Sequence, residues 1–247
     1  MQHRSKKIKK SLFIILVVLI VLSGGSAIYL SNYYHSVDVE KYMNGSSEVS
    51  VEKFDKGWFF DGAGEEKALI FYPGAKVATE AYAPLMYQLA ESGIDCFLVD
   101  MPFHMAFFGM NRAEEIMQEY NYEAWYLGGH SLGGAMAANF AADYVEDHTD
   151  GIRGLLLLAA YPTKDLSTSD MSVVTVYGSE DGVLNMDKIV ADREELMPQD
   201  YKEVCIEGGN HAQFGSYGAQ KGDGTAAIPA EEQWARTVEV FVGDESE

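Results

Sequence analysis

A serine flanked by glycines is the feature of this chain that most directly indicates chemistry. Residues 128–134 read GGHSLGG, which contains the pattern G-x-S-x-G with Ser131 at its centre. An apolar run precedes the pattern at residues 123–127, and an alanine-rich run follows it at residues 135–142. Glycines allow a strand to turn sharply into a helix, and a serine on that turn presents its hydroxyl at the edge of the sheet. The spacing therefore predicts a nucleophile elbow for acyl transfer.

A serine hydroxyl reacts well only when a base removes its proton and a carboxylate orients the base. His211 lies in a glycine-rich run, GGNHAQF, and is the predicted general base. Asp181, in the run YGSEDG, is the predicted carboxylate. Glu180 is a rival because it is adjacent, but the glycine after Asp181 suits a tight turn that directs a short side chain inward. Each of these runs follows a predicted strand, so we expect Ser131, Asp181 and His211 to meet at one edge of a sheet.

Acyl transfer also requires two backbone N–H groups that bind the developing oxyanion. The first predicted donor is the N–H of Leu132, the residue after the nucleophile. The second is expected in the loop at residues 73–76, PGAK, which follows the apolar run at residues 67–72. Within this loop we predict Ala75 as the donor.

Three further residues are candidates for the substrate pocket. Lys76 follows the predicted oxyanion donor, where it either contacts an anionic leaving group or is simply solvated. His104 and Phe103 lie in a loop after a predicted strand, and the apolar run at residues 103–110 indicates either an acyl pocket or ordinary packing. The glycine-rich segment at residues 215–224 either folds back over the site or forms a surface loop.

Apolar runs alternate with amphipathic segments along most of the chain. After an extended region near residues 49–60, we expect strands at residues 67–72, 94–99, 125–127, 155–159, 173–177 and 204–206. We expect helices at residues 82–89, 114–120, 131–145, 186–196 and 231–242. This alternation predicts an α/β protein with a parallel sheet covered on both faces. The connection at residues 160–172 is too short for a helical lid, which indicates an open site.

From residue 72 onward the chain resembles the α/β-hydrolase superfamily. The matching motifs are YPG at 72–74, GGHSLGGAMA at 128–137, LAAYP at 158–162, YGSEDG at 177–182 and GGNHAQFG at 208–215. The resemblance implies an α/β-hydrolase fold with a mostly parallel central sheet, flanking helices and no cap domain. It places a catalytic triad on Ser131, Asp181 and His211, with no cofactor and no metal.

Within the superfamily the chain is similar to a small lidless group of dienelactone-hydrolase-like proteins. That group includes membrane-anchored proteins of Gram-positive bacteria. Dienelactone hydrolases use a cysteine nucleophile, whereas this chain has Ser131, so their substrate does not carry over.

The N-terminus has the composition of a membrane-targeting segment. Five basic residues and no acidic residue occur in positions 1–10, and residues 12–30 form an apolar stretch of 19 residues. This is close to the roughly 20 residues that cross a bilayer, although small residues near position 26 also fit a cleaved signal peptide. We expect a cytoplasmic basic tail at 1–10, a transmembrane signal anchor at 11–30, a tether at 31–47 and a hydrolase domain at 48–247. The positive-inside rule places that domain outside the cytoplasm, or in the medium if the segment is cleaved.

Charge and cysteine content restrict the function further. The formal net charge of −20 argues against a nucleic-acid partner, because phosphate binding requires clustered lysine and arginine. The two cysteines, Cys96 and Cys205, lie in apolar runs and are predicted to be buried free thiols. Neither takes part in a pattern with the spacing of metal ligands.

These observations favour a carboxylesterase-like serine hydrolase that cleaves a small-molecule or lipid-like ester through an acyl-enzyme. Two alternatives remain open. The same triad could transfer its acyl group to a cell-envelope acceptor, or the scaffold could be a catalytically silent binding protein. The sequence leaves the acyl-chain length, the type of bond and the oligomeric state undetermined.

Overall fold

The computed structural model describes residues 14–18, 20, 24–25, 31–148 and 151–244. It divides into two compact units, Met1–Tyr33 and Tyr34–Glu247. The predicted anchor at residues 11–30 lies largely outside the described residues. Within the described part of the chain, no helix has the length and apolar character needed to cross a membrane. The following description concerns the second unit.

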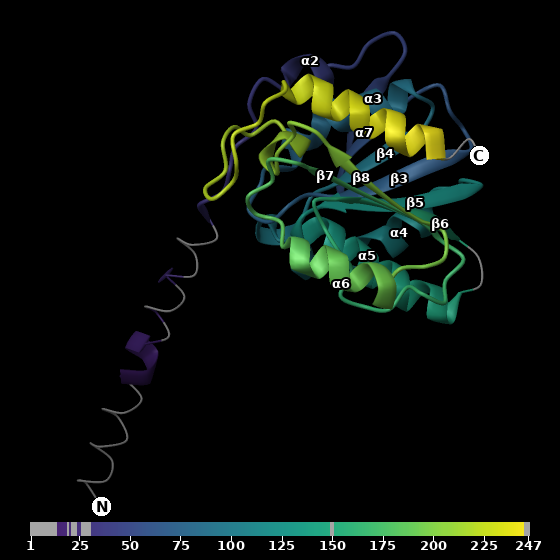
Figure 1. The fold of residues 1–247 in the computed structure, drawn as a ribbon. Helices are drawn as coiled ribbons and strands as arrows, with labels where there is room; N and C mark the ends of the chain where they lie inside the picture. The colour runs from purple at the N-terminus through teal and green to yellow at the C-terminus, as the bar shows by residue number, and fades with distance from the viewer. Residues whose placement is uncertain (1–13, 19, 21–23, 26–30, 149–150, 245–247) are drawn as a thin grey trace, which may run out of the picture. The chain divides into compact units, whose positions relative to one another are not determined.

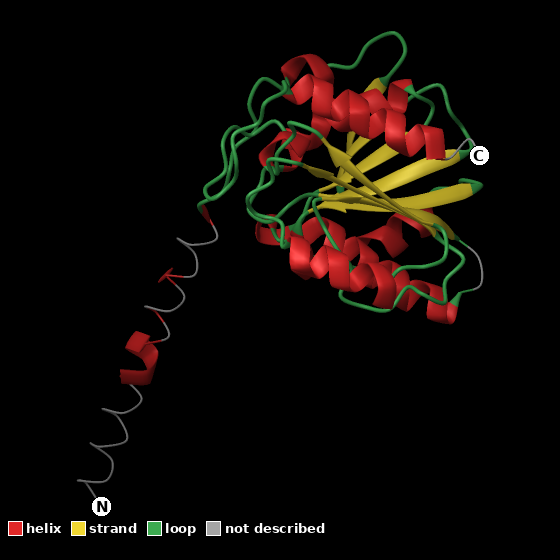
Figure 2. Ribbon diagram, in the orientation of Figure 1, coloured by secondary structure: helices red, strands yellow, loops and turns green. Residues whose placement is uncertain are grey.

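A single sheet of eight strands forms the centre of this unit (Figures 1 and 2). Its strands, in chain order, are β1 Ser50–Phe54, β2 Gly57–Asp61, β3 Lys67–Tyr72, β4 Asp95–Val99, β5 Ala124–His130, β6 Ile152–Leu158, β7 Ser172–Gly178 and β8 Tyr201–Ile206. They are arranged in space as β1-β2-β4-β3-β5-β6-β7-β8. The pairs β1–β2 and β2–β4 are antiparallel, and the remaining pairs are parallel. The carboxyl ends of β3 to β8 therefore share one edge of the sheet.

Helices cover both faces of the sheet (Figure 1). One face carries α2 Glu40–Met43, α3 Ala83–Glu91 and α7 Ala230–Asp244, and the other carries α4 Arg112–Glu119, α5 Leu132–Asp147 and α6 Met186–Glu195. Four 3-10 turns lie in the connections: η1 Thr79–Tyr82, η2 Pro102–His104, η3 Ala106–Phe108 and η4 Ala212–Phe214. The predicted fold, a mostly parallel sheet flanked by helices, is confirmed.

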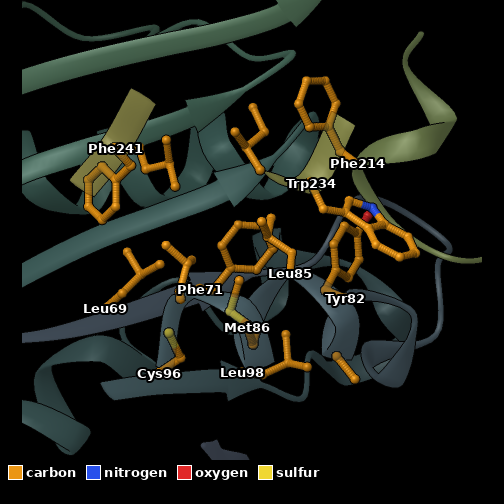
Figure 3. Packing of buried hydrophobic residues seen from close by; sticks show 14 of the residues in the cluster. Leu69, Phe71, Tyr82, Leu85, Met86, Cys96, Leu98, Phe214, Trp234 and Phe241 are labelled. Atoms are coloured by element: carbon orange, nitrogen blue, oxygen red, sulfur yellow. The ribbon is translucent and has the colours of Figure 1, made fainter. Parts of the chain in front are cut away.

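The strands are apolar on both faces because each face packs against its own helical layer. On β3, Leu69 and Phe71 point into a core with α3 and α7, whereas Ala68 and Ile70 point into a core with α4 and α5. Figure 3 shows the first core, where Phe71 lies close to residues of α3. Two-sided burial explains why the pattern of β3 is continuous rather than alternating.

The structure corrects the prediction for one cysteine. Cys96 is buried on β4, but Cys205 is exposed, and both thiols are free. Cys205 lies on β8, one of the two edge strands, which has a neighbouring strand on one side only. An apolar run alone does not distinguish such an edge strand from a central one.

The compact unit begins at Tyr34 rather than at residue 48, so most of the predicted tether belongs to it. Tyr34 forms a parallel β-bridge with Val77, and Val39 is buried in the core. The β6–β7 connection at residues 159–171 contains no helix.

Candidate active site

Ser131 occupies the sharp turn between β5 and α5. Its backbone has φ 53° and ψ −123°, a positive φ that costs a non-glycine residue on the order of 1–3 kcal/mol. The Ser131 N–H donates to the Leu158 carbonyl oxygen of β6 at 2.9 Å, and its carbonyl accepts from Ala135 N at 3.1 Å. Contacts with a neighbouring strand and with the following helix thus hold the strained turn.

The glycines around Ser131 are required by close backbone packing. A Cβ atom on Gly133 would lie 2.1 Å from the carbonyl oxygen of Tyr72, at the end of β3. A Cβ atom on Gly129 would lie 2.6 Å from the carbonyl carbon of Gly133. The start of α5 therefore approaches β3 and β5 only because these positions lack side chains.

His211 and Asp181 form a buried pair at the same edge of the sheet. His211 Nδ1 lies 2.9 Å from Asp181 Oδ2, and each side chain is only 2% exposed. The other carboxylate oxygen, Oδ1, accepts the N–H groups of Val183 and Leu184, both at 2.8 Å. Glu180 is exposed and interacts with the neighbouring Ser179 hydroxyl. Of the two candidate acids, the structure brings Asp181 to His211.

The second ring nitrogen of His211, Nε2, is buried and has no hydrogen-bond partner among the described residues. In a neutral imidazole, a proton on Nδ1 that is donated to Asp181 leaves Nε2 as an acceptor. In this arrangement Asp181 fixes the orientation of the ring through Nδ1, and Nε2 can accept a proton.

The loop after β3 has the features of an oxyanion-binding loop. In the part of the chain that the structure describes, neither the Ala75 N–H nor the Leu132 N–H donates to an acceptor. The next N–H, that of Lys76, donates to the His104 carbonyl oxygen at 2.7 Å. This bond joins the loop after β3 to the loop after β4.

Tyr82 and His130 support this loop from the protein interior. The Gly74 N–H donates to the Tyr82 hydroxyl oxygen at 3.0 Å, and that oxygen lies 2.8 Å from His130 Nδ1. Because the hydroxyl accepts from Gly74, its own hydrogen is available for His130 Nδ1. Burial lowers the pKa of His130 well below 6.5 and raises the pKa of the Tyr82 hydroxyl, so both groups are neutral. The His130 ring lies 4.4 Å from the His211 ring, measured between centroids.

A second carboxylate, Asp223, joins the acid loop to the histidine loop. Its Oδ1 accepts the N–H groups of Gly182 at 3.1 Å, His211 at 3.2 Å and Gly224 at 2.8 Å. Its Oδ2 accepts the Ala212 N–H at 2.8 Å. The glycine-rich segment at residues 215–224 thus contributes a clamp that holds the two loops together.

Sequence reasoning missed both Tyr82 and Asp223. Asp223 stands between two glycines, and this pattern is typical of a turn whose carboxylate accepts backbone N–H groups. Tyr82 stands at the start of the predicted helix at residues 82–89, and nothing in its local sequence indicates its buried polar partners.

The predicted pocket residues lie on two adjacent loops at this edge. Phe103 is 59% exposed, whereas His104 and Lys76 are half-buried. Burial lowers the pKa of His104, and the negative charges of Glu80 and Asp100 offset part of this shift.

A separate hollow of about 560 Å³ lies at the opposite edge of the sheet. Its lining includes Gly64, Lys67 and Ile94, which stand before or at the amino ends of β3 and β4. It is therefore remote from Ser131, and the loops at the carboxyl edge carry the candidate chemistry.

The eight-stranded sheet, the serine elbow and the His–Asp pair at the carboxyl edge define an α/β-hydrolase fold. A model of the Alpha/beta hydrolase family matches residues 68–235, so the chain belongs to this family. No curated protein matches the sequence.

Several solved structures share the fold. Est1E from Butyrivibrio proteoclasticus has a TM-score of 0.56 at 16% identity, covering 81% of this chain and 100% of its own. Carboxyl esterase 2 from the fungus Tuber melanosporum has a TM-score of 0.59 at 12% identity, with coverage of 85% and 89%. A monoacylglycerol lipase from Paleococcus ferrophilus has a TM-score of 0.57 at 15% identity, with coverage of 80% and 99%. At these identities the likeness establishes the fold alone.

Proposed function

We propose that this protein is a serine hydrolase that cleaves esters through an acyl-enzyme. The observation that carries the proposal is the state of His211, whose Nδ1 lies against a buried carboxylate while Nε2 has no partner among the described residues. Ser131, on a strained turn at the same edge, is the nucleophile that this base would serve.

The proposed reaction uses each group in turn. The Ser131 oxygen attacks the ester carbonyl carbon while His211 Nε2 takes its proton, and the N–H groups of Leu132 and Ala75 bind the resulting oxyanion. Collapse of this intermediate breaks the ester bond, and the alcohol leaves with the proton from His211. Water then attacks the acyl-enzyme with His211 again as base, which releases the acid and restores Ser131. Throughout, Asp181 stabilises the imidazolium and fixes the ring orientation.

Esters are the favoured substrates because the names of the structural neighbours include an esterase and a lipase, so the fold is used for this chemistry elsewhere. The β6–β7 connection at residues 159–171 contains no helix, so this connection places no helical lid over the site.

A fluorophosphonate probe tests the nucleophile directly. We expect wild-type protein to be labelled and Ser131→Ala to remain unlabelled, with parallel loss of hydrolysis across p-nitrophenyl esters from acetate to palmitate. Equal labelling of the two proteins would refute the proposal. Added alcohols or amines would distinguish hydrolysis from acyl transfer, because a transferase forms a new ester or amide from them.

We also propose that residues 11–30 anchor the enzyme and that the catalytic domain is extracytoplasmic. The support is the sequence: five basic residues, then an apolar stretch of nearly bilayer length. Protease added to intact cells would digest the domain if this orientation is correct and would leave it intact if the domain is cytoplasmic.

A further inference from the structure

Three phenylalanines form an exposed aromatic patch at the catalytic edge. Phe103, Phe107 and Phe108, here called the aromatic patch, are 59%, 66% and 53% exposed. The Phe108 ring lies 5.6 Å from the Phe103 ring and 5.4 Å from the Phe107 ring, measured between centroids. Phenyl rings that contact one another yet face water are typical of a surface that binds an apolar partner.

The backbone holds the patch outward at a cost. Phe103 and His104 have φ values of 57° and 54°, in the left-handed region that non-glycine residues rarely adopt. The His104 N–H donates to the Met101 carbonyl oxygen at 2.9 Å, and the His104 carbonyl accepts from Lys76. The bond to Lys76 also places the patch next to the predicted oxyanion loop.

The chain enters the domain at this same edge. Residues 34–37, here called the strap, form bonds with two loops of the site. The Tyr34 N–H donates to the Lys76 carbonyl oxygen at 2.7 Å, and the Val37 N–H donates to the Ser216 carbonyl oxygen at 2.8 Å. The strap thus joins the predicted oxyanion loop to the segment that follows His211. The strap and that segment run side by side in Figure 1, and the Ser216 hydroxyl donates to the Val37 carbonyl oxygen.

The length of chain before the strap indicates what covers the patch. The 19-residue apolar stretch ends at residue 30, and three residues separate it from Tyr34. Three or four extended residues span at most roughly 10–14 Å. A segment that crosses a bilayer and ends at residue 30 therefore leaves little chain between the lipid headgroups and the strap.

We propose that the aromatic patch inserts into the lipid bilayer and that the substrate is an acyl ester held in that bilayer. This inference rests on the proposed serine hydrolase function, whose substrate class it names, and on the proposed anchor at residues 11–30. The patch gives the acyl chain an apolar path from the lipid to Ser131, so the ester need not enter water. Soluble short-chain esters reach Ser131 from water and do not need the patch.

Fluorescence quenching tests the lipid contact without requiring activity. The full chain is reconstituted into phosphatidylcholine vesicles that contain brominated acyl chains, which quench tryptophan on contact. We expect strong quenching of the additional fluorescence in Phe107→Trp. Ser92→Trp is the matched control, because Ser92 is exposed and precedes β4, at the opposite edge of the sheet. Equal quenching in the two variants would overturn the proposal.

Hydrolysis supplies a second test on the same vesicles. Replacing Phe107 and Phe108 together by serine, with the predicted pocket residue Phe103 kept, should lower hydrolysis of a vesicle-embedded p-nitrophenyl palmitate at least 10-fold. Hydrolysis of soluble p-nitrophenyl butyrate should change less than 2-fold. Equal losses on both substrates, or no loss on either, would count against a lipid-binding patch. Activity that survives Ser131→Ala would instead refute the serine hydrolase and leave the quenching result standing.

Discussion

The Asp223 carboxylate provides the sharpest test of how the site is held together. Asp223→Ala removes the acceptor for the N–H groups of Gly182, His211 and Ala212, which belong to the acid loop and the histidine loop. Hydrogen bonds to a charged group contribute about 1.5–3 kcal/mol each, but Asp223 is half-buried and water would replace part of that. At about 1 kcal/mol for each of the three bonds, the loss is roughly 3 kcal/mol. Because the substitution would displace His211 and Asp181, much of this free energy should appear as a higher activation barrier. We therefore expect kcat to fall roughly 10- to 100-fold.

The assay is ester hydrolysis by Asp223→Ala, with kcat and KM measured separately and the unfolding temperature recorded. Because Asp223 lies against the loops rather than beside a bound ester, KM should change little while kcat falls. In combination with Asp181→Ala the two losses should be far from additive, since both substitutions disable the same His211. Asp165→Ala is the control, because that exposed carboxylate accepts from nearby Ser167 and from no other residue that the structure describes. A kcat within 2-fold of wild type, or full additivity with Asp181→Ala, would refute the clamp.

Three further outcomes follow from the packing around Ser131. Tyr82→Phe strands the buried Gly74 N–H and His130 Nδ1, so thermal unfolding should show a loss of about 1–3 kcal/mol, and unchanged stability would contradict the network. Gly133→Ala forces a Cβ atom against a β3 carbonyl oxygen and should yield an inactive or unfolded protein. Gly243→Ala is the control: no described atom lies within 4 Å of its added Cβ, and thermal melts should show an unchanged or higher stability. Burial lowers the pKa of His130 in the folded state, so the unfolded state binds a proton first as the pH is lowered below 6.5. The free energy of unfolding should therefore decrease by up to about 1.4 kcal/mol for each unit by which the pH is lowered. His130→Gln should flatten this dependence between pH 6.5 and 5, and an identical slope would contradict it.

Much of the architecture is encoded in local patterns. The central strands are buried on both faces, so their apolar runs are continuous and easily found, and the glycines around Ser131 identify the elbow because backbone packing tolerates nothing larger. The proximity of Asp181 and His211 could be predicted because each follows a strand of the same parallel sheet. Such elements depend mainly on their own sequence.

The elements that could not be predicted depend on distant partners. Tyr82 is 48 positions from His130, and Asp223 is 41 positions from Gly182, so no local pattern reveals either pairing. The exposure of Cys205 likewise depends on β8 being the last strand of the sheet. Long-range contacts and strand order are the information that the sequence reading lacked.

The strap has a practical and a biological consequence. A soluble fragment designed from the predicted boundary at residue 48 would lose Tyr34 and Val37, and with them the bonds to Lys76 and Ser216. Such a fragment should fold around its core yet hold the loop at residues 73–76 poorly, and a fragment that starts at residue 31 avoids this. For the same reason, a protease that cut between residues 37 and 48 would separate the domain from the segment that is hydrogen-bonded to Lys76 and Ser216. For the membrane-anchored hydrolase proposed above, release from the cell surface and inactivation would then be a single event.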